Sequence, residues 1–411
     1  MASRRGFIGG LGAATLAGMA PTLAGAGEAI GLGGSAMQEA EFLSEPGLIH
    51  LNTGTFGLMP KRVRERMAAA TRLFESNPVL QGYKDAPDTV RGQAEAVRAR
   101  VATLLNCSAD EVLLTHGTSD ALGQVAASIE FPRGSRVLTS GAEHDGGVEC
   151  WRWLARRRGG FVDEVPCPPV ETDVGAIVDR FAQAMRPETK VICVSDVIAW
   201  TGLRMPIREL AELAHAHGAL MVVDGAQASG HVPIDVTTMG VDAYAASGHK
   251  WLLGPKGTGF SYIRTDPAQR ILPVAWQDGT KVMNEGTGGA PLPQLIGLGA
   301  AIGEHARRGP AAEFARNVGL RNRLWDLLGE LPGVVPVGPP PGPQATALLG
   351  FRLPEGALAA KVRSTLLAKH RINMRAVDVK QWNGLRASLH VYNDEAQVHA
   401  LVDALRAALA S

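Results

Sequence analysis

Short apolar runs alternate with amphipathic segments along the middle of the chain. The runs at residues 111–115, 136–139, 190–194 and 219–223 have the length and β-branched content of buried strands. Segments 91–105 and 207–217 carry apolar residues at helical spacing, and Gly218 follows the second where a helix C-terminal cap is favoured. This alternation predicts an α/β fold, with a mostly parallel sheet covered by helices on both faces.

The pattern changes after residue 290. Residues 291–308 and 314–328 have helical spacing, 332–343 form a connection rich in proline and glycine, and a strand at 385–391 precedes a final amphipathic helix. A chain of 411 residues with 45% hydrophobic content is long enough for two domains. We therefore expect a large domain at 61–290 and a smaller α+β domain at 291–411, with 36–60 as an N-terminal segment.

The N-terminus carries a targeting pattern. Residues 3–8 read S-R-R-G-F-I, which matches the twin-arginine motif, and an apolar Gly/Ala-rich run follows to Leu23. Ala24-Gly25-Ala26 then offers a small-residue cleavage site. A transmembrane helix or a loose tail is the alternative, but the run is too short and too rich in glycine for a stable span. We expect residues 1–35 to be a twin-arginine signal peptide, with a periplasmic or secreted product and no stable membrane anchor.

Composition excludes several partners. A net charge of +1 and an aromatic content of 5% give no basis for binding nucleic acid. The four cysteines show no C-x-x-C spacing, so we expect neither a disulfide framework nor a cysteine metal site. His215 and His217 form an H-x-H pair, but their place in the last turn of a predicted helix explains them without a metal.

A group of polar residues follows the apolar run at 219–223. Asp224 ends the run, Gln227 lies in the next turn, and Ser247, His249 and Lys250 come together further on. A carboxylate that ends a buried strand can pair with a pyridinium nitrogen, and a lysine amine can condense with an aldehyde. Taken singly, Asp224 is explained as a strand-end cap and Lys250 as a surface lysine. The ordered set D-x-x-Q…S-x-H-K predicts pyridoxal 5′-phosphate (PLP) as the cofactor.

Two further groups lie just beyond predicted strands. The turn Gly117-Thr118-Ser119 opens a helix, and such a turn presents backbone N–H groups, hydroxyls and the positive end of the helix dipole to an anion. In isolation, a plain helix cap is the alternative. His144 follows the strand at 136–139 and can lie over a pyridine ring or on the surface. Ligands collect beyond the carboxyl ends of parallel strands, so we expect these groups near Asp224 and Lys250.

The stretch 220–260 resembles the cofactor region of the class V aminotransferases, which are fold-type I PLP-dependent enzymes. The resemblance covers about residues 45 to 410. The runs N-T-G-T-F-G, E-H-D…W and G-H-K-W-L-L-G-P-K-G are most similar to the isopenicillin N epimerase-like branch. The resemblance implies a large PLP-binding domain and a smaller C-terminal domain, with the segment at 36–60 packed on the small domain and across the mouth of the site.

The resemblance also implies a role for each of these residues. Lys250 carries PLP as a Schiff base and moves the Cα proton, Asp224 faces the pyridine nitrogen, Gln227 reaches the phenolic oxygen, and His144 stacks on the ring. The phosphate contacts are Gly117, Thr118, Ser119, Ser247 and His249. Thr287, in the turn at 285–288, reaches the site of a neighbouring subunit, which implies a homodimer. Arg386 binds the substrate α-carboxylate, and Asn52 is a further substrate-binding residue.

The same motifs leave the reaction open. A cysteine desulfurase needs a nucleophilic cysteine shortly before Arg386, and residues 351–386 contain none. We expect an aminotransferase that acts at the Cα of an amino-acid or peptide-like small molecule. An epimerase or a β/γ-lyase of the same branch is the alternative. A non-catalytic PLP-binding protein is an alternative of another class.

Overall fold

The structure, a computed structural model, describes residues 40–84, 86–168, 172–265, 271, 290–378 and 382–410. The predicted signal peptide and the turn at 285–288 that contains Thr287 lie outside these residues. Within the described ranges, no helix has the length and apolar content needed to cross a bilayer.

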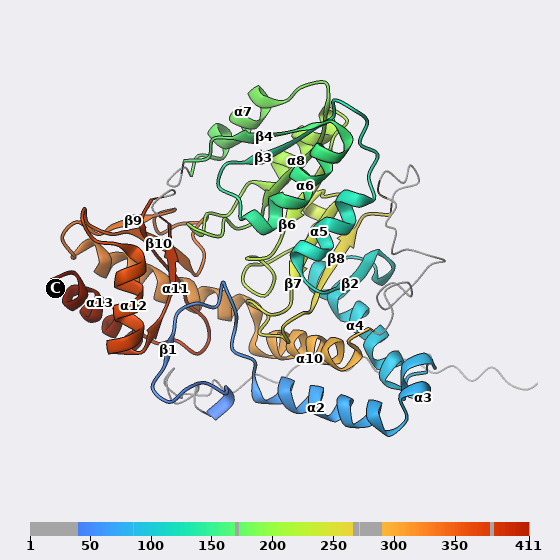
Figure 1. Cartoon of the computed structure of the whole chain (residues 1–411), viewed down its shortest axis with the longest axis horizontal. Coiled ribbons are helices and arrows are strands. Elements are labelled where there is room, and N and C mark those ends of the chain that lie inside the picture. Colours follow the sequence, from blue (N-terminus) through green and yellow to red (C-terminus); the bar gives the residue numbers. More distant parts are fainter. Residues whose placement is uncertain are drawn as a thin grey trace, which may run out of the picture. The chain divides into compact units, whose positions relative to one another are not determined.

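A seven-stranded sheet lies at the centre of the larger part of the structure (Figure 1). Its strands are β2 (Val112–Thr115), β3 (Arg136–Ser140), β4 (Phe161–Val165), β5 (Thr189–Ser195), β6 (Leu220–Asp224), β7 (Ala243–Ser247) and β8 (Gly259–Ile263). They lie in the order β2–β8–β7–β6–β5–β3–β4; β8 pairs antiparallel with both of its neighbours and the other pairs are parallel. The expected α/β fold with a mostly parallel sheet is confirmed.

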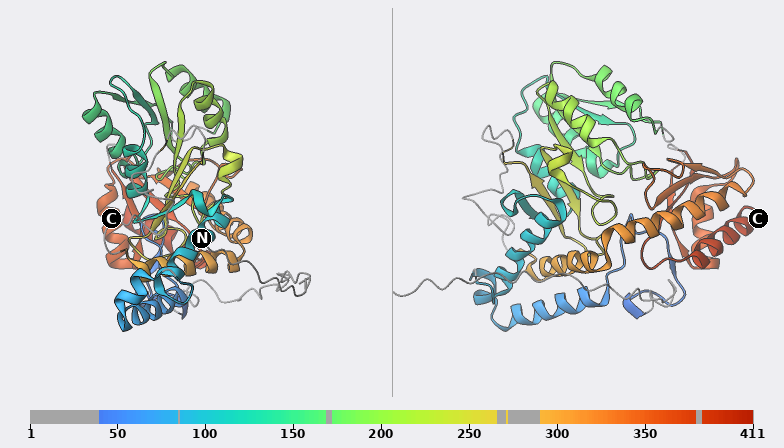
Figure 2. Two further views of the ribbon diagram at one scale, coloured as in Figure 1. Left: turned by 90° about the vertical axis from the view of Figure 1, so that its right-hand side faces the viewer. Right: turned by 180° about the vertical axis from the view of Figure 1, so that it is seen from behind.

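Successive side chains of the sheet lie in two different hydrophobic clusters, one on each face. In β6, Met221 and Val223 belong to one cluster, whereas Leu220 and Val222 belong to the other, because successive side chains of a strand point to opposite faces. The first face is covered by α4 (Val90–Leu105), α7 (Val174–Ala184), α8 (Ile207–Ala216) and α10 (Leu292–Arg308), and the second by α5 (Thr118–Ala127) and α6 (Asp145–Arg158) (Figure 2). Burial of both faces explains why these strands are continuous apolar runs in the sequence.

A second core surrounds a four-stranded antiparallel sheet in the C-terminal part. Its strands lie in the order β12 (Arg375–Val377), β13 (Gly384–Ser388), β10 (Leu348–Arg352) and β9 (Val335–Val337), and its helices are α11 (Pro310–Gly329), α12 (Ala359–His370) and α13 (Glu395–Leu409). The interpretation of 332–343 as a plain connection is wrong, because β9 lies within it.

The remaining helices are α2 (Lys61–Ser76), α3 (Pro78–Tyr83) and α9 (Val236–Met239). Helix α10 packs on α2 and α4, and its apolar side chains belong to the hydrophobic cluster on the first face of the large sheet. The domain boundaries at residues 61, 290 and 291 stay predictions.

The N-terminal segment connects the C-terminal part with the turn that carries Lys250. β1 (Ile49–His50) pairs in parallel with β11 (Ile372–Asn373), and Asn52 then forms a bridge with Ser388 of β13. Further on, the N–H of Gly57 donates to the carbonyl oxygen of His249 at 2.9 Å. The segment therefore contacts both the second core and the active-site turn.

Two buried histidines lie where the second core meets this turn. His231 donates from Nδ1 to the carbonyl of Gln227 at 2.7 Å, because its Nε2 accepts the N–H of Ala347 at 2.8 Å. Burial lowers the pKa of His231 to about 3 and that of His390 to about 4. Both rings are therefore neutral in the folded protein at neutral pH.

These histidines should make the protein sensitive to acid. An unfolded histidine titrates near pKa 6.5, so below this pH the unfolded chain binds more protons than the folded chain. The free energy of unfolding should therefore fall by about 1.4 kcal/mol per histidine between about pH 7.5 and about pH 5.5. Urea unfolding at the two pH values measures this change, and His390→Gln, which removes one of the two groups, should reduce it. A change between the two pH values that is equal in the parent and in His390→Gln would contradict the prediction.

Candidate active site

Nine of the predicted residues line one cavity of about 280 Å³. It lies at the edge of the sheet where β2, β3, β5, β6 and β7 all end, because these strands run in the same direction. The nine are Gly117, Thr118, Ser119, His144, Asp224, Gln227, Ser247, His249 and Lys250. Arg386 and Asn52 are not among the described lining residues, but Arg386 donates to the carbonyl of Ala199, which lines the cavity, and to Asn52 Oδ1. The sheet therefore brings together groups that are far apart in the sequence.

Asp224 ends β6 and is held by the turn that follows. Its Oδ1 accepts the N–H of Ala226 at 2.8 Å, and the residue is 6% exposed. Burial raises the pKa of Asp224, and the nearby amine of Lys250 opposes this rise. A buried carboxylate is costly unless a cation accompanies it. The position therefore suits a cationic ring nitrogen in the cavity.

The first turn of α6 leaves no room for a side chain beside this carboxylate. A Cβ added at Gly147 would lie 2.5 Å from Asp224 Oδ2. Gly147→Ala should therefore displace Asp224 and weaken PLP binding by about tenfold, because overpacking a buried site costs about 1–3 kcal/mol. Equilibrium dialysis measures the affinity. The matched control is Gly123→Ala in α5, where nothing lies within 4 Å of the added Cβ; it should leave the affinity unchanged. Equal affinity of the two variants would contradict the prediction.

The turn at the start of α5 and the end of β7 form a cradle of donors. The backbone N–H of Thr118 donates to Ser247 Oγ at 3.0 Å, and the two hydroxyl oxygens lie 2.7 Å apart. Gly117 has φ +156°, and a Cβ there would lie 3.4 Å from Ser247 Oγ. The buried Nδ1 of His249 has no hydrogen-bond partner among the described residues. Backbone N–H groups at a helix N-terminus, together with hydroxyls and an imidazole nitrogen that has no partner among the described residues, suit a phosphate group.

Ser119 faces α6 in this structure. Its hydroxyl donates to the carbonyl of Gly146 at 2.8 Å and so connects the start of α5 to the start of α6.

His144 is the N-cap of α6, and its Nδ1 accepts the N–H of Gly146 at 3.0 Å. Burial, and then the charge of Lys250, lowers the pKa of His144, which favours the neutral form of its ring. The ring lies 5.7 Å from that of Trp200 in a stacked orientation.

Glu143 has no predicted role, yet it joins two strand ends behind the cavity. Its carboxylate accepts hydrogen bonds from the hydroxyl of Ser140 at 2.5 Å and from the hydroxyl and backbone N–H of Ser195 at 2.5 and 3.0 Å. Burial raises the pKa of Glu143 to about 7. Its place beside His144, just beyond a strand, is the one sequence signal that could have drawn attention to it.

Lys250 follows β7 in a tightly packed turn. Its Nζ has no hydrogen-bond partner among the described residues, and burial lowers its pKa to about 8 although Asp224 opposes the shift. The turn is closed by the N–H of Leu253, which donates to the carbonyl of Lys250 at 3.2 Å. A Cβ on Gly57 would lie 2.2 Å from this carbonyl oxygen, so the N-terminal segment packs directly on the turn. The amine is therefore held in the cavity by its backbone.

Gln227 is oriented from two sides. Its Nε2 donates to the carbonyl of Gly54 at 2.8 Å, and its Oε1 accepts the indole N–H of Trp251 at 2.8 Å. A primary amide has two N–H donors, so one remains available on the cavity side. The structure therefore leaves Gln227 able to donate to an oxygen of a bound cofactor.

Arg386 is a buried cation for which no carboxylate partner is described. It is 3% exposed, and its guanidinium donates to the carbonyl of Ala199, to Asn52 Oδ1 and to Thr55 Oγ1, each at 3.0 Å. Its Nε has no partner among the described residues. Burial, and then the charge of Arg375, lowers the pKa of Arg386 to about 9. Such a group is suited to an anion, since a planar guanidinium can bind a carboxylate through two parallel hydrogen bonds. Asn52 acts here by holding Arg386.

The donor set as a whole fits PLP. Its described lining residues offer one lysine amine, the buried carboxylate of Asp224, the imidazole of His144, and a cradle in which a buried nitrogen lacks a partner among the described residues. Within the part of the chain that the structure describes, no group of three or more His, Cys, Asp or Glu side chains could hold a metal ion.

Comparisons with known proteins show which family the chain is similar to. The aminotransferase class-V family matches residues 51–401. The chain is 29% identical over 385 residues to the isopenicillin N epimerase of Streptomyces clavuligerus, a match that covers 89% of this chain and 96% of the epimerase. It is 31% identical over 341 residues to a cysteine desulfurase of Klebsiella pneumoniae, covering 76% of this chain and 81% of the desulfurase.

A solved structure is also similar to the chain. It is a mutant of the cystine C–S lyase C-DES with glycine covalently linked to its PLP cofactor. The TM-score is 0.77 at 23% identity, and the match covers 87% of this chain and 96% of the lyase. The predicted fold type and cofactor are confirmed. With most of its length matched, this chain belongs to the class V aminotransferase family of PLP-dependent enzymes.

Proposed function

We propose that this enzyme catalyses transamination at the Cα of an amino acid or a peptide-like substrate, with Lys250 as the group that moves the proton. The supporting observation is that Lys250 is the single lysine among the described residues lining the cavity, with a lowered pKa of about 8. An amine that titrates near neutral pH can accept a proton and return it. Transamination needs one such group on one face of the substrate.

When bound, PLP supplies an electron sink that makes the Cα–H bond of the substrate more acidic. Asp224 would keep the proton on the pyridine nitrogen of the bound cofactor, because the buried carboxylate would be stabilised by that cation. The ring of His144 would hold the cofactor ring, and the remaining N–H of Gln227 would be the donor for the phenolic oxygen. Thr118, Ser247 and His249 would hold the phosphate, together with the N-terminus of α5.

Arg386 binds the α-carboxylate of the substrate. Its three hydrogen bonds to Ala199, Asn52 and Thr55 orient the guanidinium before the substrate arrives. Pre-orientation of this kind lowers the entropy lost on binding. Asn52 therefore contributes to substrate binding through Arg386.

Epimerisation at the same carbon is the second candidate. It is supported by the similarity to an isopenicillin N epimerase, which spans nearly the full length of both chains. An epimerase returns the proton to the opposite face of Cα, so it needs a second route for the proton besides Lys250.

Product analysis separates these reactions. The purified enzyme is loaded with PLP and incubated with L- and D-amino acids, one at a time and without an amino acceptor. Release of the matching keto acid, in an amount no greater than that of the enzyme, is expected for transamination. Inversion of the amino acid with no keto acid would indicate an epimerase, and release of side-chain fragments would indicate a β/γ-lyase. Bound PLP with no product from any substrate would leave a non-catalytic PLP-binding protein.

We propose in addition that the enzyme is a homodimer in which Thr287 reaches the partner's site. Mixed dimers test this arrangement. A Lys250→Ala subunit combined with a Thr287→Ala subunit should regain about one working site per dimer, because one site then keeps both residues. If Thr287 served its own subunit, mixing would restore nothing.

We also propose export through the twin-arginine route, which the S-R-R-G-F-I motif supports. In a host with this pathway, the protein should be found outside the cytoplasm. Replacing both Arg4 and Arg5 with lysine should keep it inside. Equal distribution of the two forms would contradict export by this route.

A further inference from the structure

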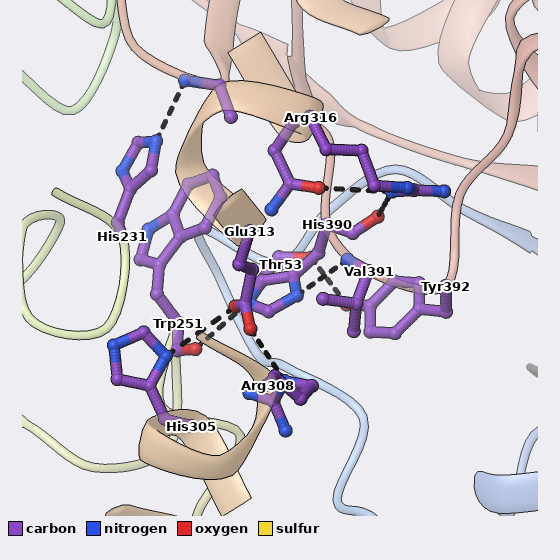
Figure 3. Close-up of polar contacts among 12 residues, drawn as sticks. Thr53, His231, Trp251, His305, Arg308, Glu313, Arg316, His390, Val391 and Tyr392 are labelled. Carbon is purple, nitrogen blue, oxygen red and sulfur yellow. Dashed lines mark hydrogen bonds and ion pairs between the residues drawn. The ribbon is translucent and has the colours of Figure 1, made fainter. Parts of the chain in front are cut away.

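Stacked rings join the active-site turn to the C-terminal part of the chain (Figure 3). Trp251, the residue after Lys250, stacks on His231 with ring centroids 3.6 Å apart and planes 7° from parallel. It also stacks on His390, with centroids 5.7 Å apart. Trp251 and His390 are fully buried, and His231 is nearly so. We refer to His231, Trp251 and His390 as the ring stack.

The hydrogen bonds of His390 set its tautomer. The N–H of Val391 donates to Nδ1 at 2.8 Å, so the ring proton lies on Nε2. Nε2 in turn donates to the carbonyl oxygen of Trp251 at 2.9 Å. His390 therefore offers one fixed donor, and the residue that it holds is the neighbour of Lys250.

A buried carboxylate supports this tautomer. Oε1 of Glu313 lies 3.7 Å from Nε2 of His390, and Arg308 Nε donates to Oε2 at 2.6 Å. Burial opposes ionisation, but His305, whose Nδ1 lies 3.6 Å from Oε1, and the charge of Arg308 lower the pKa of Glu313 to about 2. An anion at this place favours the Nε2–H form of His390.

Lys250 therefore lies between two anchored carbonyl groups. On one side, the carbonyl of His249 accepts the N–H of Gly57 from the N-terminal segment at 2.9 Å. On the other, the carbonyl of Trp251 accepts Nε2–H of His390. The indole N–H of Trp251 also donates to Oε1 of Gln227, so Trp251 is connected to Lys250 through the backbone and to Gln227 through its side chain.

We propose that His390 is a positioning residue for Lys250, which it orients by holding the carbonyl of Trp251 and, through the indole of Trp251, the amide of Gln227. His390 is not among the described residues that line the cavity, and it acts only through Trp251. The inference goes beyond the proposed function and rests on the cofactor role that this function gives to Lys250.

Two variants that carry an amide in place of the imidazole separate the effect of the Nε2–H donor of His390 from that of the rest of its ring. His390→Gln can place an N–H near the position of Nε2, whereas His390→Asn carries the same amide one methylene short of it. Because one buried hydrogen bond is lost, His390→Asn should bind PLP about tenfold more weakly and have a kcat about tenfold lower, with the KM of the amino substrate unchanged. His390→Gln should stay within about threefold of the parent in both quantities. If the cavity left by asparagine prevents folding, His390→Met, which has the length of glutamine and no donor, replaces it.

Three measurements test this role of His390. Equilibrium dialysis gives PLP affinity, a pH titration of the visible absorption of the bound cofactor reports its surroundings at Lys250, and thermal unfolding of the apoproteins reports the fold. A weaker affinity and a shifted titration in the asparagine or methionine variant, restored by glutamine, support the proposal. Parent-like affinity and titration in all variants, or equal impairment by glutamine, overturn it. Borohydride reduction of the parent enzyme must also attach PLP to the peptide of Lys250, and attachment elsewhere would overturn both this inference and the proposed role of Lys250.

Discussion

Lys250→Ala is expected to lower kcat by about 10²- to 10⁴-fold, the range by which a positioned proton-transfer group accelerates a reaction. The cavity offers no second lysine among its described lining residues to replace it. The variant should still bind PLP without a covalent bond, since the phosphate cradle and Asp224 are untouched. Single-turnover release of keto acid measures the rate, and borohydride reduction with peptide mapping measures the attachment.

Lys256 provides the matched control. It follows Lys250 closely and its pKa is also lowered by burial, but its Nζ donates to the carbonyl of Gly57 at 3.0 Å. Lys256→Ala should therefore retain covalent attachment of PLP. A Lys250→Ala enzyme with the turnover of the parent would show that another group moves the proton.

Arg386→Lys is expected to raise the KM of the amino substrate by about 10²-fold, or about 2.7 kcal/mol, within the range measured when one partner of a buried charged pair is altered. The substitution keeps the charge but removes the planar fork that can bind both carboxylate oxygens. It also loses donors to Ala199, Asn52 and Thr55, which the guanidinium holds in the parent enzyme. Steady-state kinetics with the best amino donor measure the effect.

An amine that lacks the α-carboxylate distinguishes substrate binding from a structural role of Arg386. With this amine, the parent enzyme and Arg386→Lys should have similar KM values, because neither can use the carboxylate contact. Asn52→Ala should show a smaller rise in KM with the full substrate, since two of the three partners of Arg386 remain. An equal rise in KM for the amine and the amino acid would contradict the assigned contact.

Much of the larger core follows from local patterns. Strands buried on both faces appear as apolar runs, and parallel strands that share a direction must end at one edge, which is why Asp224, His144 and Lys250 could be expected together. Predicting the edges of the sheets is harder. Strand β9 includes Pro336 and lies in a proline-rich stretch, which in the sequence looks like a loop. An edge strand tolerates proline, because the backbone N–H groups on one of its sides pair with no neighbouring strand.

By itself, the sequence determined the α/β class, the cofactor and nine of the residues that line the cavity, because those residues lie in short ordered motifs next to strands. Tertiary structure alone decided which groups hold them. Arg386 is oriented by Asn52 and by Ala199, and Trp251 is held by His390, although each pair is far apart in the sequence. Contacts of this kind leave no periodicity in the chain, since they form only after the N-terminal segment, the larger sheet and the C-terminal sheet have packed together.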